Sequence, residues 1–233
     1  MRTTRCVAAL ALIIAACTGT RAASLPSSAK TIGVISLLPS TGHLMHVALL
    51  RFNNACKPFD LKGANLETAA FNAASRALRR YKVVRLTAAP GAELHTRNTE
   101  VMGAFKSFPS IAAQIRALAH PPQSIDAYLL IWARAAQSEC LDNPRAYGFG
   151  LTKLGVNTAV VHAYAQVILI DAHTEEELAT VSTRGATAPL SGFDWTGQSA
   201  EVSAEQAQQI RTAVQTAFAG AISAEVGNLL PAR

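Results

Sequence analysis

The chain has 233 residues, half of them hydrophobic, and a formal net charge of +6 at pH 7. This length suits one domain with a substantial core. The basic residues are scattered, and their densest cluster, residues 79–82, is more typical of a solvated helix end than of a nucleic-acid-binding patch. No apolar run beyond the first 16 residues is long enough for a transmembrane helix.

The amino terminus has the parts of a secretory signal. Arg2 and Arg5 supply a positive region, and an apolar run over residues 6–16 follows before a stretch of small residues. The run is too short to span a bilayer as a finished helix. We therefore predict that residues 1–16 are a signal peptide and that the protein is exported.

Two cleavage sites fit this leader. Residues 14–17 (IAAC) resemble a bacterial lipobox, in which case Cys17 would become the new amino terminus and carry fatty acyl chains, palmitate among them. Ordinary cleavage after Ala22 would instead make residues 1–22 the leader. Thr18 is not the aspartate that favours inner-membrane retention, so the lipoprotein would sit on the outer membrane and face the periplasm. The alternative product is a soluble periplasmic or secreted protein.

The rest of the chain predicts a tether over residues 17–30 and one domain over residues 31–233. Apolar runs between turn residues predict strands over residues 31–38, 43–52, 55–61, 81–87, 125–135, 158–170 and 178–181. The first two runs flank a PSTG turn and are expected to form a hairpin. Pro58 would confine the third strand to a sheet edge.

The stretch 158–184 is the centre of the predicted sheet. Its alternating residues give one wholly apolar side and one mixed side, as in a strand that covers a core with one face. The apolar side consists of Val161, Ala163, Ala165, Val167 and Leu169. Residues 171–176 (DAHTEE) interrupt the run with turn-prone and charged side chains. We predict a long central β-hairpin.

Three helices are predicted from stripes of small or apolar residues. The first is capped by Asn65 and runs to residue 80, the second starts at residues 107–109, and the last runs to about residue 230. Ser203 and Gln206 have the capping-box spacing that begins the last helix.

Residues 137–157 and 185–197 are expected to be loops. The mixture of strands and helices predicts a single-domain α/β fold, in which helices, including a C-terminal one, pack on a mixed β-sheet.

The sequence lacks the usual catalytic patterns, with no GxSxG, HExxH or P-loop motif. Lys153 stands where a dinucleotide-binding loop beginning at Gly148 would need its third glycine. His43 and His46 are three residues apart on a predicted strand, so they point to opposite faces and cannot share a metal. The acidic residues of the hairpin tip are typical of a solvated turn. We predict no catalytic residue, no metal and no cofactor.

Besides Cys17, three residues are candidate sites. Cys56 and Cys140 are the cysteines that remain outside the leader, and in an exported protein they can pair in a disulfide that stabilises by about 4 kcal/mol. A free thiol or a disulfide to a partner are the alternatives. Trp195, in a glycine-containing loop, would either anchor a partner or fold back onto the core.

Several segments together resemble one group of bacterial envelope proteins. They are an early strand (TIGVISLL), a helix of small residues (NLETAAFNAASRALRR), two further strands (YKVVRL and SIDAYLLIWARA), a long strand ending in DAHTEEELA, and a C-terminal helix. This order is similar to the curli-secretion lipoprotein, the lipoprotein activators of penicillin-binding proteins, the amino-terminal domain of the Tol-system propeller protein, and uncharacterised bacterial lipoproteins. The likeness covers about residues 31–230.

Two departures from that group stand out. Glu175 takes the place where the hairpin usually has glycine, and an extra hairpin over residues 43–61 separates the first strand from the first helix. The resemblance implies a non-enzymatic assembly or regulatory factor, and no catalytic residue carries over.

We therefore expect a non-enzymatic cell-envelope lipoprotein that binds another envelope protein and contacts the membrane through its N-terminal lipid. One alternative is a periplasmic hydrolase assembled from residues 88–106, 136–157 and 185–200, around His95, Asp142 or Asp194. The other is a small-ligand carrier, which would need an enclosed apolar pocket.

Overall fold

A computed structural model describes residues 25, 27–47, 55–89, 92, 94, 95, 109–133, 148–154, 159–183, 187–190, 193 and 201–230. The predicted leader, Cys17, Cys140 and Trp195 lie outside these residues.

The described chain folds into two mixed five-stranded sheets and three α-helices, which confirms the predicted α/β class. The first sheet has the order β4 (Lys82–Leu86), β1 (Thr31–Leu37), β5 (Ala127–Trp132), β8 (Gln166–Asp171), β9 (Glu177–Ser182). The second has the order β3 (Ala55–Asp60), β2 (Thr41–Val47), β6 (Gly148–Leu154), β7 (Ala159–Tyr164), β10 (Thr187–Leu190).

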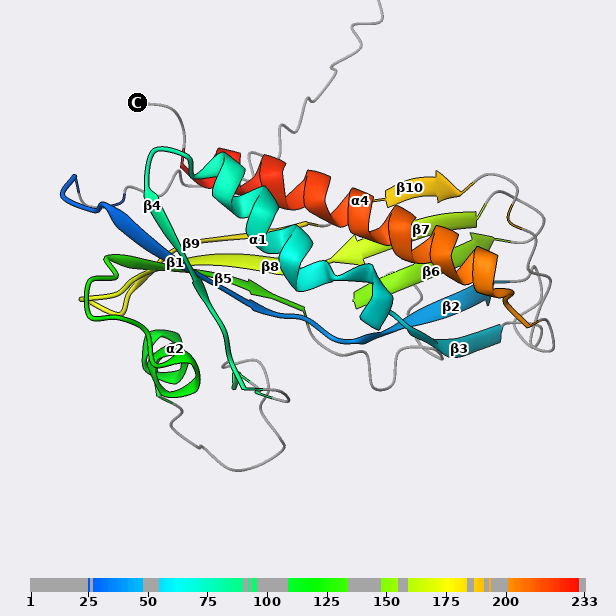
Figure 1. Ribbon diagram of the computed structural model, residues 1–233, viewed down its shortest axis with the longest axis horizontal. Coiled ribbons are helices and arrows are strands. Elements are labelled where there is room, and N and C mark those ends of the chain that lie inside the picture. Colours follow the sequence, from blue (N-terminus) through cyan, green and yellow to red (C-terminus); the bar gives the residue numbers. More distant parts are fainter. Residues whose placement is uncertain are drawn as a thin grey trace, which may run out of the picture.

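The two sheets correspond strand for strand. Four pairs of strands, β1 with β2, β5 with β6, β7 with β8, and β9 with β10, follow one another in the chain and hold matching places in the two orders. Figure 1 shows the sheets lying end to end. The fold is therefore one long, five-stranded layer that is broken across its middle.

Thr183 holds the chain together at this break. Its buried hydroxyl donates to the carbonyl oxygen of Ala163 (2.9 Å) and accepts from the backbone N–H of Ala165 (2.8 Å). Its own N–H donates to the Ala165 carbonyl oxygen at 2.9 Å. Ala165 is the single residue between β7 and β8, so Thr183 provides partners for backbone groups that the two ladders leave out at this point.

The predicted hairpin between residues 31–38 and 43–52 is wrong. β1 pairs in parallel with β4 and β5, whereas β2 pairs with β3 and β6 in the other sheet. At the PSTG segment the chain leaves the first sheet and continues forward into the second. Turn residues between two apolar runs are compatible with a hairpin and with such a continuation. The expectation that Pro58 places β3 at an edge is confirmed.

Helices cover both faces of the first sheet. α1 (Leu66–Ala77), which follows a short 3-10 helix (Lys62–Ala64), lies beside α4 (Ala204–Leu229) on one face, and α2 (Ile111–Ala119) lies on the other (Figure 1). α4 also packs on β6, β7 and β10 of the second sheet. One apolar cluster fills the space under α1 and α4, and a second lies between α2 and the first sheet.

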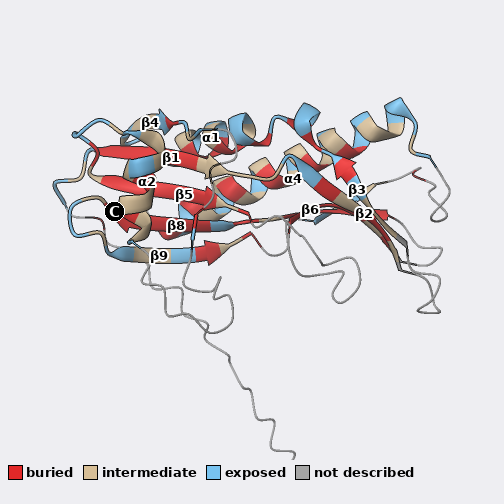
Figure 2. Ribbon diagram, turned by 90° about the horizontal axis from the view of Figure 1, so that it is seen from below, coloured by how far each residue is buried: buried red, intermediate tan, exposed pale blue. Residues whose placement is uncertain are grey.

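The predicted hairpin is confirmed over residues 166–182, where β8 pairs with β9. It is neither as long nor as central as predicted, because residues 159–164 form β7 in the second sheet and β9 lies at a sheet edge. The predicted stretch nevertheless faces the core as expected. All five residues of its predicted apolar side are buried in the larger cluster, and Figure 2 shows such buried positions along the strands. On the mixed side, Ile168 and Ile170 are buried against the α2 cluster.

The predicted helix starts are partly confirmed. Ser203 and Gln206 form the expected capping box of α4. Asn65 stands at the start of α1 but makes no side-chain cap bond, because its backbone is left-handed with φ of 48°. α2 begins at Ile111, where the Ser110 hydroxyl accepts from the Ala113 N–H, a little later than predicted.

Two strands were predicted as loops. β6 lies within residues 137–157, where glycines suggested irregular structure, and β10 lies within residues 185–197. Gly150 is required in β6 because the backbone of β2 approaches closely. A Cβ atom there would lie 1.9 Å from the carbonyl oxygen of His43. Phe149 and Leu151, on either side, are buried in the core.

Candidate functional site

The sequence-predicted site residues are mostly outside the described chain, as Cys17, Cys140 and Trp195 are. Cys56, on the edge strand β3, is disulfide-bonded, and its partner also lies outside the described residues. Its pairing with Cys140 therefore stays a prediction.

The edges of the two sheets differ in how they are protected. Strand edges expose backbone groups that can pair with another chain, and proteins usually block them with proline or with charged residues, especially lysine. β3 contains Lys57 and Pro58, β10 contains Pro189, and β4 contains Lys82 and Arg85. β9 (ELATVS) contains no proline and no basic residue, and its one charged residue, Glu177, stands at its first position next to the turn. Among the described strands, β9 is the edge with the least protection.

A tight turn sets the position of β9. Asp171 closes β8, and its Oδ1 accepts the backbone N–H groups of His173 (2.7 Å) and Thr174 (2.9 Å). These bonds, first the one from Thr174, hold the pKa of the Asp171 carboxyl below its ordinary value although burial opposes them. The carboxylate is therefore ionised at neutral pH. Within the turn it accepts the two N–H groups in place of backbone carbonyl oxygens.

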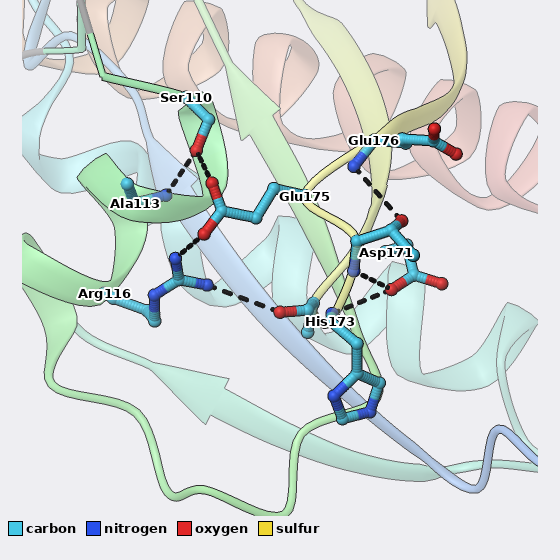
Figure 3. Close-up of polar contacts among 9 residues, drawn as sticks. Ser110, Ala113, Arg116, Asp171, His173, Glu175 and Glu176 are labelled. Atoms are coloured by element: carbon cyan, nitrogen blue, oxygen red, sulfur yellow. Dashed lines mark hydrogen bonds and ion pairs between the residues drawn. The ribbon is translucent and has the colours of Figure 1, made fainter.

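Glu175 fixes the turn to α2, as Figure 3 shows. Its backbone is left-handed with φ of 63°, the conformation for which glycine is favoured. Its carboxylate accepts from the Arg116 guanidinium and from the Ser110 hydroxyl. Arg116 also donates to the carbonyl oxygen of Ala172 at 3.3 Å. This explains why glutamate can stand here, because its side chain makes contacts that glycine could not.

Asp126 ties the neighbouring strand ends together. Its Oδ2 accepts the backbone N–H groups of Lys30 and Thr31, both at 2.8 Å, and these bonds lower the pKa of its carboxyl. The Nε2 atom of His173 lies 3.6 Å from its Oδ1. The polar groups at this end of the first sheet are thus engaged in holding the β8–β9 turn and the start of β1.

The second sheet carries two histidines on its outer face. His43 and His162 both pair in register with Gly150. Burial lowers the pKa of both imidazoles, and for His162, where the charge of His43 adds to the effect, the pKa falls to about 4. Both rings are therefore neutral at pH 7. His46, on the same strand as His43, points to the opposite face, as predicted from its spacing.

Of the residues suggested for a hydrolase, His95 is the one that lies in the described chain. His95 is exposed and its backbone pairs with Gln114, while Asp142 and Asp194 lie outside the described residues. In the ranges that the structure describes, no three His, Cys, Asp or Glu residues gather at metal-binding distance.

Comparison with known proteins finds no protein family and no curated protein that matches this chain. In the described part of the chain, none of the helices has the length and hydrophobicity needed to cross a membrane.

Sequence reasoning missed the role of β9 as an open edge and the grouping of His43 with His162. The composition of residues 177–182 was a usable signal for the first, because this strand has no proline and no basic residue. The second depended on β6, which lies between the two histidine strands and was predicted as a loop.

Proposed function

We propose that the protein is a non-enzymatic lipoprotein of the bacterial cell envelope that binds an extended segment of another envelope protein along β9. The observation that carries the proposal is the position of β9 at the end of its sheet, where none of the described strands pairs with the backbone groups that face away from β8. An added strand could pair with these groups.

The geometry of β9 supports strand addition. A register shift next to Leu169 disturbs the ladder near the turn, but Ala179, Thr180, Val181 and Ser182 pair regularly with β8. The turn below them is fixed to α2 through Glu175, so the edge is held in place before a partner arrives. A preorganised edge loses little conformational entropy when it binds.

The lipoprotein part of the proposal is supported by the leader. The IAAC segment ending at Cys17 provides the acylation signal, and residues 17–30 provide a tether of about 50 Å at most between the membrane and β1. Anchoring and partner binding would then use separate parts of the chain.

The edge can be tested by placing a lysine on it. Thr180 is exposed on β9, and Thr216 is exposed on α4. In intact envelopes, a photocrosslinking residue at position 180 should give a discrete adduct, and Thr180→Lys should abolish recovery of the same protein in a pull-down. The matched variant Thr216→Lys should recover it as the wild type does. Equal recovery by both lysine variants would reject β9 as the binding edge.

The anchor is tested separately with Cys17→Ser. We expect loss of palmitate labelling, a lower intact mass and release from the membrane fraction, with partner binding retained in the soluble extract. A wild-type protein whose mature chain begins at residue 23 would contradict the lipid assignment and leave the β9 proposal standing.

A further inference from the structure

The outer face of the second sheet brings His43 and His162 into one row. Their strands, β2 and β7, flank β6, and both residues are in register with Gly150. The residues next to them, Leu44 and Val161, are buried in the main core, so the two imidazoles lie on the other face. Two strand spacings place their Cα atoms about 9.5 Å apart. Since the residue between them is Gly150, β6 itself places no side chain between the rings.

A thioether adjoins this row. Met45 follows His43 by two residues on the same face, is only 6% exposed, and belongs to neither apolar cluster. It pairs with Thr152, whose Oγ1 lies 3.4 Å from the Nδ1 atom of His162. Met45 and the two histidines are therefore grouped around Gly150 and Thr152.

The chemistry of this group favours a soft cation. Neutral imidazole and thioether ligands select Cu(I), whereas carboxylate and carbonyl oxygens select Mg²⁺ or Ca²⁺. His162 is buried and His43 is half-buried on this face, so both rings lie at least partly away from bulk water. The Thr152 hydroxyl can accept from Nδ1–H of His162 and so leave Nε2 free to bind.

We propose that His43, Met45 and His162 form a binding site for a soft monovalent ion, Cu(I) or its analogue Ag(I), with Thr152 orienting His162. The site uses a thioether as its third ligand in place of a third His, Cys, Asp or Glu. His43 is only half-buried, which gives the ion an entry from solvent on the β2 side. The proposal goes beyond the sequence expectation of no metal and is independent of partner binding at β9.

The test is an anaerobic competition for Cu(I) against the chelator bicinchoninate. It uses the full chain without a histidine tag and with free thiols alkylated. We expect one Cu(I) per protein. His43→Gln and His162→Gln should weaken binding by more than about 100-fold, and Thr152→Val by about tenfold, the usual effect of losing an orienting partner. His120→Asn changes an exposed histidine at the end of α2 and should bind as the wild type does.

A second measurement separates ligation from loss of folding. Met45→Leu conserves side-chain volume and should keep the thermal unfolding temperature while weakening Cu(I) binding. In the wild type, Ag(I) should shift the NMR signals of the Met45 methyl group and of the His43 and His162 rings together. Complete transfer of Cu(I) to the chelator, an unmoved Met45 methyl signal, or wild-type binding by a folded Met45→Leu variant would each overturn the proposal.

Discussion

Glu175 has a backbone conformation that residues with side chains rarely adopt, with φ of 63°. It occupies the turn before β9, and its carboxylate contacts Arg116 and Ser110 of the α2 region. Backbone strain and side-chain contacts act in opposite directions at this residue, so substitutions can separate them.

Glu175→Gly and Glu175→Ala remove the same carboxylate. Only glycine also relieves the left-handed backbone, so we expect the alanine variant to be less stable than the glycine variant by about 1 kcal/mol in urea unfolding. The side chains of Arg116 and Glu175 are 40% and 36% exposed. A double-mutant cycle should therefore give a coupling below about 1 kcal/mol. An alanine variant as stable as the glycine variant would show that the backbone is not strained.

His162 should make the stability depend on pH. Its pKa of about 4 in the folded protein is below its ordinary 6.5, so the unfolded chain takes up a proton in this range before the folded chain does. Stability contributed by the neutral ring is fully present above pH 6.5 and is lost as the pH falls toward 4, by about 3 kcal/mol in total. His43, which faces His162 from β2, acts in the same direction.

Urea unfolding at pH 7, 5.5 and 4.5 checks this expectation. His162→Gln should flatten the fall in the free energy of unfolding over this window, whereas His120→Asn should leave it unchanged. Asp126 and Asp171 have lowered pKa values, so their stabilisation is lost only below their ordinary pKa of 3.8. A wild-type slope in His162→Gln would mean that another group titrates.

At the scale of elements, the junction between β7 and β8 depends on Thr183. Thr183→Val keeps the shape of the side chain but leaves the Ala163 carbonyl and the Ala165 N–H without this buried partner. We expect a loss of about 1–3 kcal/mol in the free energy of unfolding. Thr216→Val, at an exposed position of α4, should cost less than about 0.5 kcal/mol. Similar losses for the two variants would argue against a special role of the junction.

Elements with strong local patterns were predictable from sequence. The alternation over residues 159–170 indicated which side faces the core, and the apolar stripe and capping box indicated α4. β6 was not predictable because its glycines suggested a loop. Gly150 is needed there because the backbone of β2, which is far away in sequence, approaches closely. The sequence also did not reveal that the chain continues forward from β1 into β2 instead of turning back in a hairpin. The reason is the same, because the strands that pair with β1 and β2 come much later in the chain.

The candidate sites were less predictable than the fold. His43 and His162 could be assigned to strand faces, but their common row exists only once β6 lies between β2 and β7. The turn at Glu175 could be located, whereas its contacts with Arg116 and Ser110 needed the position of α2. The spacing of residues within one segment could be read from the sequence, whereas the register between distant segments could not be predicted from it.

At the scale of the whole molecule, α4 joins the two sheets. Its 26 residues span about 39 Å, and its buried side contacts strands of both halves. The buried residues of this side are Ile210, Val214, Phe218, Ile222, Val226 and Leu229. Phe218 packs edge-to-face on Phe149 of β6, with ring centroids 4.9 Å apart.

Phe218→Ala should lower the free energy of unfolding by about 3–5 kcal/mol. Because both sheets share the cluster under α4, we expect the variant to unfold in a single transition, with near- and far-UV circular dichroism changing together. Two separate transitions would show that the halves are independent folding units.

The strand-for-strand continuity of the two sheets also governs when the fold can form. Each sheet collects its strands from early and late parts of the chain, so no single cut divides the chain into two fragments that each contain one whole sheet. Neither layer is complete before residues 177–190 have been supplied, and α4 comes after them. A chain with this arrangement cannot complete its core until nearly all of it is available. If the proposed export is correct, this delay would keep the polypeptide unfolded while it passes through a membrane pore.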